Sequence, residues 1–205
     1  MKRFRFTLLA VCLVLLYLGA TDVSLSLRNR EPLPATVEEL ERSGAPREWL
    51  TVSGGHQNVL DAINMTGTIE IDALLVPLTL SPEGRSYRVL FETRDPQILD
   101  TWKTYYFKLD SPLAKETYLA EHRDAFFPRR ELTGMVVGGL VASGNRDKLL
   151  KLAREVGMDV ADDAIFISEG KEPPRYRGGF FLVIALLGLV KIVGMMKKAQ
   201  QSPPA

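Results

Sequence analysis

Apolar residues without charge are concentrated at the two ends of the chain. Phe6 to Ala20 form a run of 15 residues with no charge, and Gly178 to Met196 form a run of 19 residues interrupted only by Lys191. At about 1.5 Å rise per residue, 19 helical residues span roughly 28 Å, close to the thickness of a hydrocarbon core. A domain of this size does not easily enclose such a helix on every side. The second run therefore predicts a transmembrane helix and not a buried core helix.

The first apolar run allows three interpretations. A cleaved signal peptide needs small residues before the cut, but cleavage after Ala20 would place the bulky Leu18 at the third position back. A lipoprotein signal is suggested by the residues before Cys12, but Val11 is large for its position in such a signal. We favour the third interpretation, an uncleaved anchor that extends to about Val23.

These patterns divide the chain into five segments: an N-terminal anchor (1–27), a central domain (28–170), a tether (171–177), a transmembrane helix (178–196) and a basic, proline-containing tail (197–205). Basic residues near the ends of membrane helices favour the cytoplasmic side. Lys and Arg residues precede the first run and follow the second, so we expect both termini in the cytoplasm. The central domain would then lie in the periplasm of a bacterial inner membrane. Arg residues at 28, 30, 175 and 177 flank the helices on the other side and oppose this orientation.

Strand and helix patterns interleave irregularly in the central domain. Apolar alternation or short apolar runs predict strands at 49–53, 68–80 (with a break at Pro77), 87–93, 105–109, 132–141 and 164–168. Helical patterns start at about 36, 96, 112 and 145, and one or two helical turns are expected over 58–63. We therefore predict an α+β domain with a mixed or antiparallel sheet of five or six strands and several helices, with a small, partly open barrel as the alternative.

Several local signals add detail to these elements. Thr36 and Glu39 form a capping-box pattern, which predicts a helix that ends at Gly44. The turn-forming residues 81–84 separate two strands and predict a hairpin. Pro77 lacks an amide donor, so its strand should be an edge, contain a bulge or be divided in two. Asn145 is expected to cap a helix, and the glycines within 132–141 should allow close approach or a bend.

Composition removes several classes of function. The chain carries 26 Lys or Arg and 25 Asp or Glu residues. Without the terminal regions, 20 basic and 24 acidic residues remain, a net charge of about −4. Nucleic acid is therefore not an expected partner, because such binding depends on a basic surface. The single cysteine, Cys12, lies in the first apolar run, so the central domain has no disulfide and no thiolate site.

No catalytic or metal-binding motif is present. The two histidines, His56 and His122, are 66 residues apart without an HExxH pattern. The phosphate-loop, dinucleotide-binding and GxSxG patterns are absent. We expect no cofactor and no metal, and we name no catalytic residue.

Two groups of residues remain as candidate sites. Phe126, Phe127, Arg129 and Arg130 combine residue types that are enriched in protein interfaces, as does the aromatic segment 105–107. Lys191, inside the second run, would reach toward the membrane surface or contact a polar group of a partner helix. The alternative is a ligand-binding loop formed by Gly54, Gly55 and His56 after a predicted strand.

The sequence thus favours a non-enzymatic, two-span integral membrane protein. Its outer domain would serve as an interaction, scaffold or assembly module, with the lipid bilayer and other membrane subunits as partners. Two terminal spans around one domain form a layout that resembles that of Surfeit-type cytochrome-oxidase assembly proteins. The resemblance is one of layout and includes no sequence motif, so it implies no residue roles. A membrane-tethered enzyme or small-ligand sensor using the His56 loop is the competing hypothesis.

Overall fold

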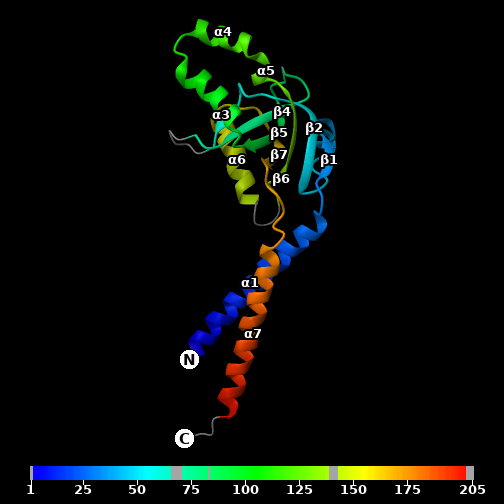
Figure 1. The fold of residues 1–205 in the computed structure, drawn as a ribbon, viewed down its shortest axis with the longest axis vertical. Coiled ribbons are helices and arrows are strands. Elements are labelled where there is room, and N and C mark those ends of the chain that lie inside the picture. The colour runs from blue at the N-terminus through cyan, green and yellow to red at the C-terminus, as the bar shows by residue number, and fades with distance from the viewer. Residues whose placement is uncertain (1, 66–70, 83, 139–142, 202–205) are drawn as a thin grey trace. The chain divides into compact units, whose positions relative to one another are not determined.

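A computed structural model describes residues 2–65, 71–82, 84–138 and 143–201 (Figure 1). The chain forms two compact units. One is built from the two ends of the chain, and the other is Glu31–Glu172. The two units are described separately below.

The helical unit is an antiparallel pair of long helices, α1 (Lys2–Arg28) and α7 (Arg177–Gln201). By length and composition, Phe6–Arg28 and Arg177–Met196 qualify as membrane spans. Within the most apolar stretch of each segment, 17% and 11% of the residues are buried. Their apolar side chains remain on the outside of the pair.

Small residues form the contact between α1 and α7. A Cβ atom at Gly19 would lie 2.8 Å from Leu182 Cγ, and one at Gly178 would lie 2.9 Å from the Gly19 carbonyl oxygen. One at Gly188 would collide with Cys12 Sγ. Small residues allow helix backbones to approach closely, which is the usual source of helix association in lipid.

The second unit contains a closed five-stranded barrel. The described residues of this unit form seven strands: β1 (Leu33–Thr36), β2 (Trp49–Gln57), β3 (Ile63–Asn64), β4 (Leu74–Thr79), β5 (Tyr87–Thr93), β6 (Arg129–Val136) and β7 (Val160–Glu169). The barrel consists of β2, β6, β7, β5 and β4, and β1 and β3 extend the sheet. The strands pair in the order β1-β2-β6-β7-β5-β4-β3, and an additional β2–β4 pairing closes the barrel. The β1–β2 and β5–β7 pairs are parallel and the other pairs are antiparallel. The predicted α+β class and mixed sheet are confirmed. The sheet closes into a five-stranded barrel and is not flat, so the structure is nearer to the alternative of a small barrel, although the barrel is closed and not partly open.

Closure depends on a bulge in β2. The register of β2 against β6 shifts by one residue between Val52 and Gly55, and Gly54 adopts a φ of 79°. Beyond the bulge, His56 and Gln57 pair with β4. The expectation that this strand ends at Gly54 is wrong, because the bulge bends the strand instead of ending it.

The hairpin of β4 and β5 is confirmed, and Pro77 is accommodated without an edge. Pro77 pairs with Leu90 of β5, while its carbonyl accepts a hydrogen bond from Asn58 N on the opposite side at 2.9 Å. In an extended strand, N and O of one residue point the same way. The Pro77 nitrogen, which has no hydrogen to donate, therefore points to the gap between β3 and β2. No hydrogen bond between strands is lost there.

The folded unit also contains α2 (Val37–Ser43), α3 (Pro96–Lys103), α4 (Pro112–Glu121), α5 (Arg123–Phe126) and α6 (Ser143–Glu155). The capping box of α2 is confirmed: Glu39 N donates to Thr36 Oγ1 at 3.2 Å, and Thr36 N donates to Glu39 Oε2 at 2.8 Å. Gly44 ends α2 with a φ of 78°. The predicted cap at Asn145 is wrong, since α6 begins two residues earlier.

Two other predicted elements are wrong. Residues 58–63 form no helical turn, because the Asn58 side chain accepts a hydrogen bond from Asp61 N and holds a tight turn. Residues 105–109 were expected to form a strand, but Thr104–Lys108 is a π-helix that continues α3. Part of the predicted strand 68–73 lies outside the described residues, and its described part, 71–73, is not a strand. Residues 139–141 of the expected strand 132–141 also lie outside the described residues.

Strand alternation separates two hydrophobic clusters. Val89 and Phe91 of β5 join the larger cluster inside the barrel, whereas Leu90 joins a smaller cluster with Phe166 and with Ala153 of α6. Apolar residues on both faces of these strands are thus explained, because α6 covers the outer face.

Candidate functional site

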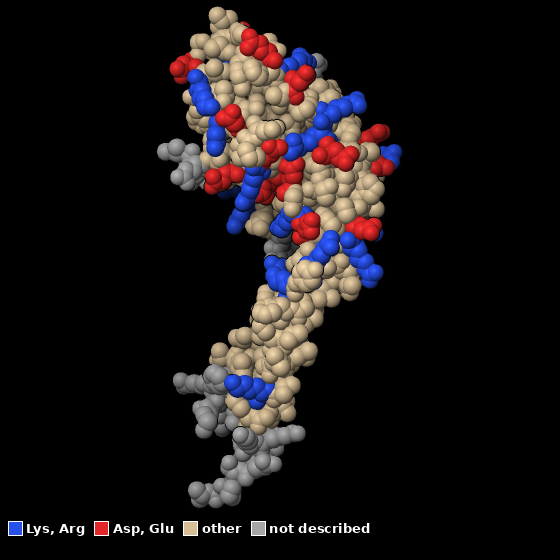
Figure 2. All heavy atoms as spheres, viewed as in Figure 1, with Lys and Arg blue, Asp and Glu red and all other residues tan. Residues whose placement is uncertain are grey.

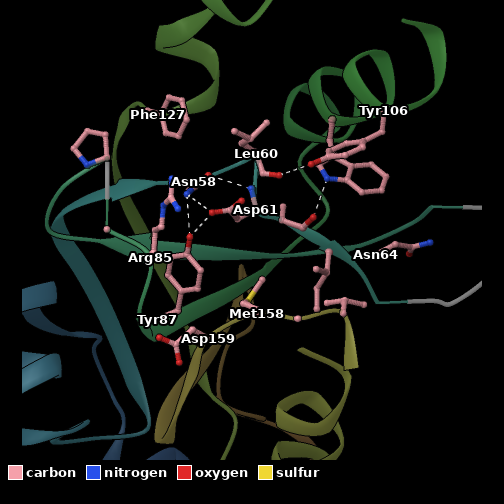
Figure 3. Close-up of a pocket in the computed structure, with 17 residues that line it drawn as sticks. Asn58, Leu60, Asp61, Asn64, Arg85, Tyr87, Tyr106, Phe127, Met158 and Asp159 are labelled. Atoms are coloured by element: carbon pink, nitrogen blue, oxygen red, sulfur yellow. Dashed lines mark hydrogen bonds between the residues drawn. The ribbon is translucent and has the colours of Figure 1, made fainter. Parts of the chain in front are cut away.

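An open cleft of about 1070 Å³ lies on the folded unit (Figure 3). It is formed by the segment from Asn58 to Asn64, the turn before β5, the end of α3 and the loop before β7. Aromatic side chains from three separate parts of the chain line it: Tyr87 of β5, Trp102 and Tyr106 of the continuous segment of α3 and the π-helix, and Phe127 before β6. A cleft of this size, with aromatic walls and a few polar groups, has the usual features of a ligand-binding site.

The polar centre of the cleft is a network of Asn58, Asp61 and Tyr87. Tyr87 Oη donates a short hydrogen bond to Asp61 Oδ2. Asn58 Nδ2 lies 2.9 Å from the same carboxylate oxygen and 3.2 Å from Tyr87 Oη. Asn58 and Tyr87 are buried, whereas Asp61 is exposed at the cleft surface. Both donors therefore bind the same oxygen of Asp61, Oδ2 (Figure 3).

The protonation of Tyr87 limits its chemistry. Burial, followed by the hydrogen bond to Asp61 and the negative charge of Asp61, raises the pKa of Tyr87 well above its ordinary value. Tyr87 therefore stays protonated at neutral pH. It acts as a hydrogen-bond donor that orients Asp61 and not as a general base.

The π-helix and α3 supply the aromatic wall. Trp102 Nε1 donates to the Ala62 carbonyl at 2.9 Å, and Tyr106 Oη donates to the Leu60 carbonyl at 2.6 Å. The two rings are 4.8 Å apart between centroids. Burial raises the pKa of Tyr106 to about 12. The wall is therefore fixed to the backbone of the Asn58–Asn64 segment.

Few of the side chains that line the cleft are charged. Its described lining includes the charged residues Asp61, Asp159 and Arg85, but no histidine, cysteine or serine. Within the described parts of the chain, no group of three or more His, Cys, Asp or Glu side chains is placed to hold a metal ion. An oriented carboxylate between aromatic walls favours a ligand with hydrogen-bond donors.

The predicted ligand loop lies elsewhere, in β2. Gly54 forms the bulge, and a Cβ atom at Gly55 would lie 2.6 Å from Val37 Cγ2. His56 is half-buried, with Nδ1 3.2 Å from the Phe127 carbonyl and Nε2 3.4 Å from Arg129 Nε. These three residues are not part of the described lining of the cleft.

The predicted interface residues separate into two groups. Phe126 is fully buried, with its ring 5.4 Å from that of Tyr105. Arg130 donates to Glu169 Oε1 at 2.6 Å and to Asp95 Oδ2 at 3.3 Å, so internal ion pairs engage its charge. Phe127 is half-buried at the cleft and Arg129 is exposed.

In the helical unit, Lys191 is exposed on α7. The buried Asp22 of α1 pairs instead with Arg177, whose Nε and Nη2 lie 2.7 and 3.0 Å from its two carboxylate oxygens. The structure thus places the predicted site residues in at least three separate regions.

Sequence reasoning missed the Asn58–Asp61–Tyr87 network. The Asn-x-x-Asp spacing is a signal for a turn in which an Asn side chain bonds the backbone. Tyr87 is 26 residues from Asp61 and reaches it through the barrel fold alone. Comparisons with known protein families, curated proteins and solved structures found no match to this chain.

Proposed function

We propose that this chain is a non-enzymatic, two-span integral membrane protein whose folded unit serves as an interaction or assembly module of a membrane complex. The exposed apolar surface of the helical unit carries the proposal. Phe6, Leu13, Phe180 and Leu187 are more than half exposed, as are other large apolar residues of α1 and α7. Figure 2 shows this unit as a nearly uncharged surface. Such a surface is costly in water and is expected in lipid.

The close packing of α1 against α7 supports retention of α1 as an anchor. The sole cysteine provides a direct test, because Gly188→Cys would place a second thiol beside Cys12. We expect the variant to form an intramolecular disulfide in membranes under mild oxidation. Gly194→Cys is the control, since a side chain there meets nothing within 4 Å. Loss of the first 20 or so residues from the mature chain, or equal cross-linking in both variants, would contradict the paired anchor.

The proposal includes an orientation in the membrane, with both termini in the cytoplasm. Antiparallel spans bring both termini to one side of the membrane, and the basic chain start favours the cytoplasm. The folded unit is then periplasmic in a bacterial inner membrane. A reporter that is active only outside the cytoplasm, inserted between Ser143 and Gly144, should give a signal. A silent reporter in a stably produced fusion would reverse the orientation.

The surface proposed for partner binding is formed by Tyr106, Phe107 and Leu113, on the π-helix and α4. These apolar side chains are 39%, 66% and 73% exposed. Residues of α4 are exposed or half-buried throughout. Aromatic residues on an exposed surface are typical of protein interfaces.

A photo-crosslinking residue at position 107 tests this surface in intact membranes. We expect an adduct with another membrane protein at 107 and not at Leu80, an exposed apolar residue outside this surface (48% exposed). Phe107→Asp should release the same protein during gentle detergent extraction. A clean monomer without adducts at position 107 would overturn the interaction function.

The cleft supports a second candidate function, the binding of a small ligand. The specific observation is the carboxylate of Asp61, oriented by Asn58 and Tyr87 beside the aromatic wall. Native mass spectrometry of protein purified from its own membrane should show a bound small molecule that Asp61→Asn loses. Retention of the same molecule by the variant would exclude this site.

A further inference from the structure

The basic residues near the chain termini lie at one end of the α1–α7 pair. Gly19 faces Gly178, and Cys12 faces Gly188, so the helices run antiparallel. By this register, the first turn of α1 lies at the same end as residues 195–198 of α7. Five basic residues occupy these two helix ends: Lys2, Arg3, Arg5, Lys197 and Lys198.

No acidic residue balances these charges. The sequence has no Asp or Glu in residues 1–21 or 178–205. Asp22 is the one acid of α1 and α7, and it lies beside Gly178 at the opposite end of the pair. Its carboxylate is already bound by two nitrogens of Arg177. The basic end therefore keeps an uncompensated positive charge.

Lys191 adds a sixth charge from within the span. It is exposed, while the neighbouring Ile192 is buried against the pair, so Lys191 faces outward. It precedes Lys197 by six residues, or about 9 Å along the helix. A lysine side chain covers much of this distance when it extends toward the membrane surface. Lys191 thus adds its charge at the depth of the lipid headgroups.

We propose that this basic end binds the headgroups of anionic phospholipids in the cytoplasmic leaflet. The inference rests on the membrane-spanning part of the proposed function and adds the chemistry of the lipid. Clusters of basic residues next to a membrane span attract anionic lipid, and each Lys or Arg changes the affinity by roughly fivefold. A lipid surface fits better than a single acidic protein segment, because the charges are spread over the ends of two helices.

The test uses the full chain in detergent micelles, titrated with phosphatidylglycerol or phosphatidylcholine and followed by native mass spectrometry. We expect tighter binding of phosphatidylglycerol, weakened by added salt. Lys197→Gln/Lys198→Gln should weaken it by about 25-fold, and Lys191→Gln by about fivefold. The control is Lys148→Gln/Lys171→Gln, which removes the same charge from exposed positions of the folded unit and should leave binding unchanged.

Three results would overturn the lipid site: equal affinity for the two lipids, no effect of the basic-end variants, or an equal effect of the control. An acidic protein that copurifies with the chain and is released by the same variants would also overturn it, in favour of a protein partner. These failures are distinct from failure of the membrane anchor itself. A chain that stays soluble and monodisperse without detergent would refute both proposals, whereas a detergent-dependent chain without lipid preference would refute only this one.

Discussion

Gly134 of β6 is the position where the barrel tolerates a side chain least. It pairs with Leu50 of β2 on one side and with Glu169 of β7 on the other. A Cβ atom at Gly134 would lie 2.9 Å from Ile167 Cγ2 and 2.9 Å from the carbonyl carbon of Ser168, and it would collide with the Ser168 carbonyl oxygen. Carbon atoms prefer separations of about 3.5 Å or more, so the deficit is roughly half an ångström.

The expected cost of Gly134→Ala follows from what must move. The main obstacle is backbone, which cannot rotate away as a side chain would. Relief requires β6 to separate from β7 near two flanking hydrogen bonds, Val137 N to Phe166 O (2.7 Å) and Gly170 N to Thr133 O (2.9 Å). Overpacking costs about 1–3 kcal/mol, and a weakened hydrogen bond costs up to about 1 kcal/mol. We expect a loss of about 2–4 kcal/mol in the free energy of unfolding.

Urea unfolding of the full chain in micelles provides the measurement. Both tryptophans, Trp49 and Trp102, belong to the folded unit, so their fluorescence reports on the barrel. Gly144→Ala in α6 is the control, because a Cβ atom there meets nothing within 4 Å. Because Ala has a higher helix propensity than Gly, Gly144→Ala should leave the free energy of unfolding unchanged or raise it by up to about 1 kcal/mol. If Gly134→Ala unfolds within about 0.5 kcal/mol of the unchanged chain, the close approach of β6 and β7 is refuted.

Three further predictions address the α2 cap, two tyrosine hydroxyls and the helical pair. Thr36→Ala should lower the free energy of unfolding by about 1 kcal/mol, because the α2 cap is lost. The control, Thr117→Ala in α4, should change the free energy of unfolding little. Equal effects of the two variants in urea titrations would refute the cap. Burial raises the pKa of Tyr106 to about 12 and that of Tyr87 further above the ordinary value, so only the unfolded chain loses these protons near pH 10. The contribution of these tyrosines to the free energy of unfolding should be fully present below about pH 10 and be lost as the pH rises through 12. Tyr106→Phe should make the fall in the free energy of unfolding shallower. An unchanged slope would show that Tyr106 does not cause the fall. Asp22→Asn should reduce the yield of the engineered α1–α7 disulfide, and an unchanged yield would show that the ion pair does not hold the helices together.

Elements defined by neighbouring residues were predictable from the sequence. The capping box of α2, the β4–β5 hairpin and the N-cap of α3 at Asp95 each depend on residues a few positions apart. Such signals act through local hydrogen bonds and turn geometry, which the sequence displays directly. The turn at 81–84 and the apolar run after it also placed strand β5 at its observed bounds.

Barrel closure and the π-helix were not predictable in the same way. Closure rests on two β2–β4 residue pairs beyond a bulge, and a bulge leaves no distinct signal in a Ser-Gly-Gly sequence. The aromatic residues 105–107 have a high strand propensity, yet tertiary contacts hold them in a helical conformation. The Tyr105 ring packs on Phe126, and the Tyr106 hydroxyl bonds the Leu60 carbonyl, 46 residues away in sequence. Distant partners therefore override local propensity here.

The same contacts determine which site hypotheses remain. Phe126 and Arg130 had the residue types of an interface, but the fold engages both internally, one in the core and the other in ion pairs with Asp95 and Glu169. Removing an internally paired group would therefore lower stability and say little about a partner. Exposed side chains without such internal roles are the informative ones to change. Phe107, in the aromatic segment 105–107 that the sequence also suggested, is 66% exposed and has one ring contact among the described residues, edge-on with Trp102 at 5.7 Å between centroids. The partner proposal therefore depends on Phe107 and not on Phe126 or Arg130.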